Sequence, residues 1–111
     1  GLHVEANVGR VTVCAEAIAL GRALSQGSSA LETIVAVRRA NHDPTRFTVV
    51  SPCGMCRELI ADYMPHGFVL CVEDEQLKKV PVLALLPGRY DRDVPVLAGS
   101  REFLDKHNQE R

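Results

Sequence analysis

Three cysteines constrain the fold of this chain more than any other feature of its sequence. Cys53 and Cys56 stand in the segment Pro52-Cys53-Gly54-Met55-Cys56, and Cys14 opens the segment Cys14-Ala15-Glu16. Each segment stands where the residue pattern predicts the start of a helix, and Pro52 suits the opening of the second one. If the two helix starts face each other, three sulfurs from two elements meet at one point. The fold therefore has to bring two distant parts of the chain together.

The spacing of apolar residues predicts alternating strands and helices. We expect strands over residues 2–6, 31–37 and 68–72, with a short extended segment over 47–50 and a strand or helical turn over 80–85. Helices are expected over 12–25, with Thr12 as the N-cap, and over 52–63 and 100–107. Residues 41–44 should form a loop and residues 73–79 a polar turn. Only about seven residues connect the strand at 68–72 to the segment at 80–85, whereas a parallel crossover needs about a dozen. The last two strands should therefore pair antiparallel, in an α/β fold whose mixed sheet of about five strands has helices on both faces.

The cysteine pattern favours a catalytic metal site. Three protein ligands leave one coordination position for water, whereas structural zinc sites close that position with a fourth protein ligand. Helix N-termini lower thiol pKa values and stabilise negative charge, and Arg57 adds a positive charge next to the last cysteine. Glu16, two residues beyond Cys14, can take a proton from water and deliver it to a substrate. We predict Zn²⁺ held by Cys14, Cys53 and Cys56, with Glu16 as the catalytic acid and base.

Two other interpretations of the cysteines remain open. Cys71 could complete a closed structural zinc site, or Cys53 and Cys56 could form a thioredoxin-like redox pair. Neither interpretation accounts for Glu16, and the redox pair leaves Cys14 without a role. Cys71 stands in an apolar strand, so we expect it to be a small buried hydrophobic residue.

The composition of the chain argues against a nucleic-acid-binding, membrane-spanning or secreted protein. Thirteen Lys and Arg are interspersed with 14 Asp and Glu, so no basic stripe suggests a nucleic-acid polymer as partner. No apolar run reaches the roughly 18–20 residues of a membrane span, and the first residues do not resemble a signal peptide. A Cys-x-x-Cys in a chain of this composition favours a reducing compartment, and we expect the protein to be cytoplasmic.

The two cysteine motifs resemble the cytidine deaminase family in its all-cysteine branch, which includes blasticidin S deaminases. The segments that carry the resemblance are Val13-Cys14-Ala15-Glu16, Ser51-Pro52-Cys53-Gly54-Met55-Cys56-Arg57 and, further along the chain, Leu85-Leu86-Pro87. The resemblance covers residues 1–90 of a single deaminase domain and leaves 91–111 as a divergent tail. It implies a three-layer α/β/α fold and a homotetramer or dimer. It also implies that the helix and hairpin that precede the position of Gly1 in the family are missing.

The resemblance further implies a zinc-dependent hydrolase that removes an exocyclic amine from a free nucleoside or a nucleoside-like aminopyrimidine. The backbone amide of Ala15 would bind the substrate carbonyl, and Glu5 would hold the ribose. His3 replaces the family's usual asparagine, and Ala17 replaces a common arginine. We therefore expect cytidine to be a poor substrate. An antibiotic or other heterocycle deaminase, and a catalytically silent zinc-stabilised binding domain, remain as alternatives.

Overall fold

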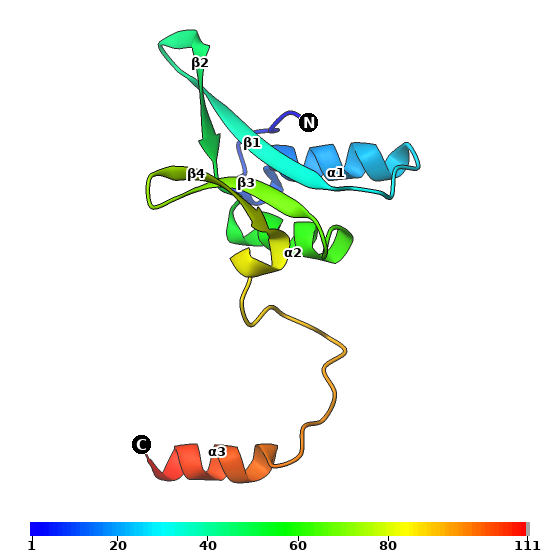
Figure 1. Cartoon of the computed structure of the whole chain (residues 1–111), viewed down its shortest axis with the longest axis vertical. Coiled ribbons are helices and arrows are strands. Elements are labelled where there is room, and N and C mark those ends of the chain that lie inside the picture. Colours follow the sequence, from blue (N-terminus) through cyan, green and yellow to red (C-terminus); the bar gives the residue numbers. More distant parts are fainter. Residues whose placement is uncertain (111) are drawn as a thin grey trace.

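The helices that begin at the two cysteine motifs lie against a mixed β-sheet (Figure 1). The structure is a computed structural model that describes residues 1–110. Its elements, in chain order, are η1 (Gly9–Val11), α1 (Ala15–Ser25), β1 (Thr33–Ala40), β2 (Asp43–Val50), α2 (Gly54–Tyr63), β3 (Phe68–Glu73), β4 (Gln76–Pro81), η2 (Val82–Leu85) and α3 (Ser100–Gln109). No helix among residues 1–110 is long and apolar enough to cross a membrane.

The sheet has the strand order β2-β1-β3-β4. β1 runs parallel to β3, and the β1–β2 and β3–β4 pairs are antiparallel. The antiparallel pairing of the last two strands, predicted from the length of their connection, is confirmed. That connection is shorter than the polar turn expected over 73–79, because Asp74 and Glu75 both adopt positive φ and make a two-residue turn. β4 consequently starts at Gln76, and its charged residues are strand residues.

Two further boundaries differ from the expectation. The loop predicted over 41–44 is a tight connection, and β2 begins at Asp43, since backbone pairing with β1 extends the hairpin through polar residues. The first helix begins at Ala15 with Cys14 as its N-cap, so the predicted cap Thr12 is wrong. The hydroxyl of Thr12 accepts a hydrogen bond from the Ala6 N–H at 3.1 Å instead.

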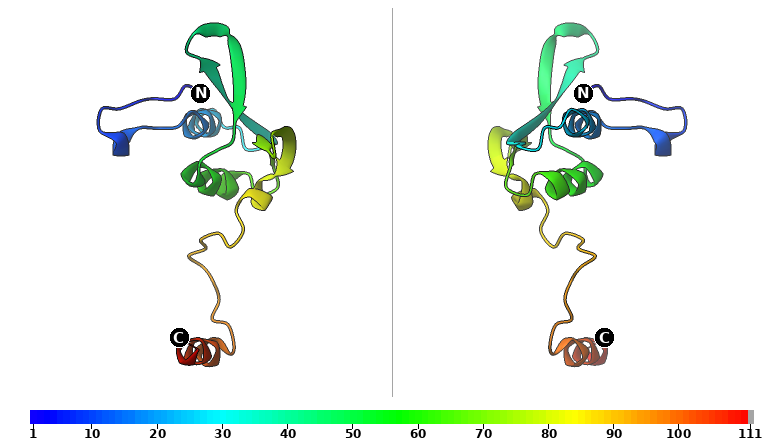
Figure 2. Two further views of the ribbon diagram at one scale, coloured as in Figure 1. Left: turned by 90° about the vertical axis from the view of Figure 1, so that its left-hand side faces the viewer. Right: turned by 90° about the vertical axis from the view of Figure 1, so that its right-hand side faces the viewer.

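Helices α1 and α2 pack side by side on one face of the sheet (Figure 2). The core lies between them and the sheet, and Cys71 belongs to it, as predicted from its apolar strand. Its buried residues are Leu20, Cys56, Ile60, Ala61, Met64, Val69, Cys71 and Val82. The α/β class and the mixed sheet are confirmed.

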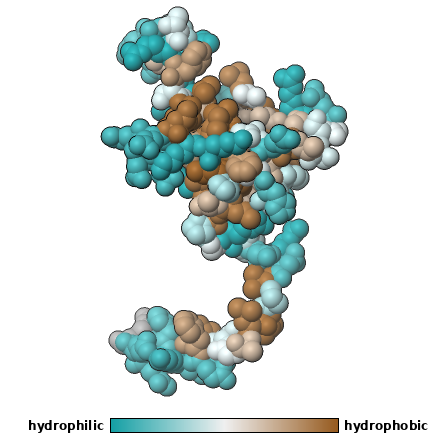
Figure 3. Space-filling model, in the orientation of Figure 1, coloured by the Kyte–Doolittle hydropathy of each residue, from teal (hydrophilic) through white to brown (hydrophobic). Residues whose placement is uncertain are grey.

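Residues 1–110 form two of the three expected layers. α3 lies apart from the sheet (Figure 1), so no helix of these residues covers the second face. Apolar side chains gather on that face (Figure 3), and the exposed ones on its strands are Val35, Val37, Phe47, Phe68, Val72 and Leu77. The sheet has four strands in the described part of the chain, where about five were expected for the complete fold. Residues 2–6 contribute a single bridge, between Val4 and Val13.

Ile60 should be essential for the packing of α2 against the sheet, because its side chain is fully buried among the core residues. Changing Ile60 to Ala should lower the free energy of unfolding by about 2–5 kcal/mol, from lost burial and a residual cavity. Urea denaturation measures this loss. The control is Leu77→Ala, since Leu77 is mostly exposed on β4. Equal losses for the two variants would contradict the assigned core.

Candidate metal centre and active site

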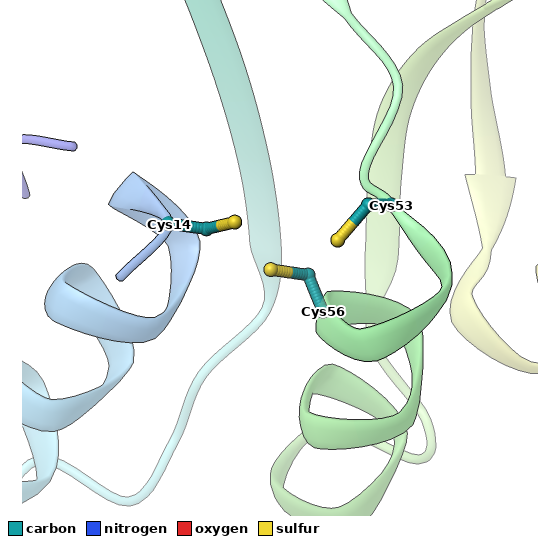
Figure 4. A group of neighbouring side chains, drawn as sticks. All are labelled: Cys14, Cys53 and Cys56. Carbon is teal, nitrogen blue, oxygen red and sulfur yellow. The ribbon is translucent and has the colours of Figure 1, made fainter. Parts of the chain in front are cut away.

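The side chains of Cys14, Cys53 and Cys56 point toward one another from the first turns of α1 and α2 (Figure 4). Their sulfur atoms all lie within 4.8 Å of one another, and none of the three is in a disulfide. Within residues 1–110, Cys71 is not part of this group, because it faces the core from β3. The cluster thus has three sulfur donors, and the closed site with Cys71 as a fourth ligand does not form.

Local helix geometry places these sulfurs. Cys14 and Cys53 are the N-caps of α1 and α2, both with extended backbone, so each side chain lies beside the first turn of its helix. Cys56 follows three residues after Cys53, close to one helical turn, and therefore lies on the same side of α2. Packing of α1 against α2 then brings Cys14 to the other two.

The three thiols differ in how readily they lose a proton. The backbone N–H of Cys56 lowers the pKa of Cys53, which outweighs burial. Burial raises the pKa of Cys56, and its contacts with Cys14 and Cys53 raise it further. A hydrogen bond with Cys56 lowers the pKa of Cys14, but burial and the neighbouring Cys53 and Glu16 together raise it.

This donor set fits Zn²⁺. Three thiolates so close together repel one another, and a bound cation removes that penalty and deprotonates coordinating thiols. Sulfur donors at this mutual distance suit the tetrahedral zinc ion, whose bonds to sulfur are about 2.3 Å long. The N-terminal ends of two helices also stabilise the net negative charge that such a site carries.

An open pocket of about 550 Å³ lies over the cluster. It is lined by every residue predicted for the site except Cys56, which is buried beneath it. The lining residues are His3, Glu5, Cys14, Ala15, Glu16, Ala36, Val37, Arg38, Arg39, Val50, Ser51 and Cys53. The structure brings the predicted residues into one pocket, and their individual roles stay predictions.

His3 and Glu5 reach the pocket through a short backbone pairing. Val4 and Val13 form an antiparallel bridge with two N–H···O bonds of 2.9 Å. Because residues at alternate positions of an extended segment share a side, His3 and Glu5 lie together, and Nε2 of His3 is 2.7 Å from Oε2 of Glu5. The bridge at Val13 thus carries both side chains to the start of α1.

Sequence reasoning missed the wall of the pocket that the sheet provides. Residues 36–39 come from β1, Val50 is the last residue of β2, and Ser51 follows it directly. The hydroxyl of Ser51 accepts a hydrogen bond from the N–H of Val72 and donates one to the carbonyl of Val72, both at 3.2 Å. These two hydrogen bonds hold the residue after β2 against β3. Two consecutive arginines at the end of an apolar strand were the signal in the sequence, but their place depends on how the strands pair.

Arg57, expected near the cysteines, holds the backbone around them. Its Nε donates to the carbonyl of Pro52 at 2.8 Å, and its Nη1 donates to that of Leu85 at 3.3 Å. These contacts link the start of α2 to the end of η2. Arg57 does not line the pocket.

Residues 1–72 match the family model of the cytidine and deoxycytidylate deaminase zinc-binding region. The chain belongs to this family. Over 94 residues it is 52% identical to a blasticidin-S deaminase from Bacillus cereus, covering 83% of this chain and 67% of the relative. Over 93 residues it is 30% identical to a protein named "Probable cytidine deaminase" from Dictyostelium discoideum, covering 84% and 60%. Over 95 residues it is 26% identical to a cytidine deaminase from Sporosarcina psychrophila, covering 84% and 65%.

The resemblance inferred from the cysteine motifs is thereby confirmed. The chain spans between 60% and 67% of the length of these relatives. Membership of the family implies a hydrolase that acts on a C–N bond of a cytosine-type ring. The family model describes a zinc-binding region, and the cluster of Cys14, Cys53 and Cys56 fits a zinc ion.

We expect the purified protein to contain about one zinc per chain. Replacing Cys14, Cys53 or Cys56 by Ser should remove most of it, because each supplies one of three sulfurs. The matched control is Cys71→Ala, which should keep the zinc content although it alters the core. Elemental analysis of metal per protein gives the answer. Loss of zinc from Cys71→Ala equal to that from Cys14→Ser would contradict the assignment.

Proposed function

We propose that this protein is a zinc-dependent hydrolytic deaminase of a free nucleoside or nucleoside-like aminopyrimidine. The observation that carries the proposal is that Glu16 lines one open pocket together with Cys14 and Cys53 of the cysteine cluster. Water and the ring amine react, so that a C–O bond forms, the C–N bond breaks, and the products are a ring carbonyl and ammonia. A catalytically silent zinc domain is not favoured, because it has no use for a carboxylate at this position.

Glu16 is the proton carrier in this proposal. When bound, zinc supplies the Lewis acidity that makes water a nucleophile near neutral pH. Glu16 stands in the first turn of α1, two residues beyond the metal ligand Cys14, and lines the pocket. Its carboxylate accepts a proton from the attacking water and passes it to the ring nitrogen; it then accepts the proton of the newly formed hydroxyl group and passes it to the leaving amine.

The other pocket residues orient the substrate. Ala15 is the first residue of α1, and N–H groups in a helix's first turn have no partner within the helix. Its N–H can therefore donate to the ring carbonyl. Glu5 accepts hydrogen bonds from hydroxyl groups of the substrate, and His3, whose Nε2 is hydrogen-bonded to Glu5, offers its Nδ1 to the substrate. The hydrogen bond between His3 and Glu5 fixes the orientation of both.

The substrate we favour carries a side group other than plain ribose. Two observations support this: His3 stands where the family usually has asparagine, and the chain is 52% identical to a blasticidin-S deaminase. A site built for one set of polar groups discriminates strongly against another, because unmatched groups stay unpaired. Blasticidin S is therefore the first compound to test beside cytidine.

We also propose the setting in which the protein acts. By resemblance it assembles as a homotetramer or dimer, and we place it in the cytoplasm because its cysteines need a reducing compartment. Residues 1–90 would be the deaminase domain and 91–111 a tail.

Changing Glu16 to Gln should lower turnover by at least about a hundredfold, because the amide cannot carry the proton. Zinc content and melting temperature should stay close to those of the unchanged protein, since Gln has nearly the same shape. Ammonia release under saturating substrate measures the effect. Turnover equal to that of the parent would remove Glu16 from the mechanism.

Cytidine should be used less efficiently than blasticidin S. The measurement is kcat/KM for cytidine, deoxycytidine and blasticidin S with the same zinc-loaded preparation. The prediction fails if cytidine gives about 10⁵ M⁻¹s⁻¹ or more and exceeds the other two, since that is the range of efficient enzymes. His3→Asn should shift the preference toward cytidine.

A further inference from the structure

Arg38 forms part of the pocket wall that β1 provides. Side chains alternate along a strand, so Arg38 and Ala36 lie on the same face of β1. Ala36 pairs with Val50, and all three residues line the pocket together with Glu16. Arg38 thus lines the same pocket as His3 and Glu5, the residues proposed to hold the substrate side group.

The guanidinium of Arg38 has no partner within residues 1–110. It takes part in no ion pair and no side-chain hydrogen bond there. The neighbouring Arg39 differs, because its guanidinium lies 5.8 Å from the centre of the Phe47 ring on the other face of the strand. Both arginines line the pocket, but within residues 1–110 only Arg38 shares the strand face of Ala36 and has a guanidinium without a side-chain contact of this kind.

Arg38 places a positive charge in a pocket that otherwise contains several negatively charged groups. Glu5 and Glu16 add two carboxylates to a pocket whose cysteine cluster is itself negative when it holds a dication. Such a pocket repels an anionic substrate unless a cation stands where the anionic group is bound. A plain nucleoside places no charge there and needs no arginine.

We propose that Arg38 is a specificity residue that binds an anionic group, a carboxylate or a phosphate, on the side group of the substrate. A guanidinium offers paired donors that match either group. The inference rests on the proposed deaminase function and names the class of substrate for that same site. It predicts a charge preference that neither Glu16 nor the cysteines provide.

The test compares substrates that differ only in charge. Zinc-loaded protein is assayed with cytidine, cytidine 5′-monophosphate and the 5′-carboxylate of cytidine, and the two anionic compounds distinguish a phosphate site from a carboxylate site. In Arg38→Gln, KM for the preferred anionic compound should rise about ten- to a hundredfold with kcat little changed, since a charged hydrogen bond is lost. KM for cytidine should stay the same. Arg38→Lys should restore part of the loss.

The matched control is Arg46→Gln, which removes the same charge from β2 outside the pocket lining. It should leave the ratio of KM values unchanged. Equal effects of Arg38→Gln on neutral and anionic substrates, or a parent protein with no preference for either anion, would overturn the proposal.

A binding measurement separates this inference from the proposed function. Calorimetry with the deaminated compounds uridine, uridine 5′-monophosphate and the uridine 5′-carboxylate needs no turnover. If no amine releases ammonia, the deaminase proposal fails. Tighter binding of an anionic compound that disappears in Arg38→Gln still supports Arg38, and its absence overturns the role.

Discussion

The meeting of two helix N-termini is the constraint on which the rest of this structure depends. Cys14 and Cys53 cap α1 and α2, and Cys56 follows on the same side of α2, so the cluster exists only while the two helices keep their relative position. Mutual repulsion opposes the deprotonation of three thiols held this close together, and a bound dication reverses the sign of the effect. Binding of the metal and packing of the helices should therefore support each other. The core residues beneath, Ile60 among them, hold the same geometry from the other side.

Local features of the sequence predicted the parts of the site that local geometry determines. The cysteine spacing indicated two helix starts because the relation between Cys53 and Cys56 depends on a single helical turn. The antiparallel last pair followed from the short connection between two strands. Burial of Cys71 followed from its apolar neighbours. None of these inferences required knowledge of how distant segments are arranged.

The features that sequence reasoning missed depend on pairing between strands. Arg38 reaches the pocket because β1 pairs with β2 in the register that joins Ala36 to Val50, and that register cannot be derived from either strand alone. The start of β2 at Asp43 was missed for the same reason, since hairpin pairing outweighs a polar composition. Thr12 was taken as a cap because it has the right chemistry, yet its hydroxyl bonds to Ala6, and a cysteine occupies the cap position.

The pocket is built from two kinds of element with separate tasks. The groups proposed for the reaction, Glu16 and the cysteines, stand at helix starts, whereas His3, Glu5 and Arg38 stand on extended segments around them. Under the proposed roles, substitutions on those segments change the contacts of the substrate side group without moving the metal ligands or the proton carrier. In evolutionary terms, such a division lets substrate choice diverge among relatives while the chemistry is inherited unchanged. The same division identifies the positions at which laboratory selection for a new amine substrate should concentrate its mutations.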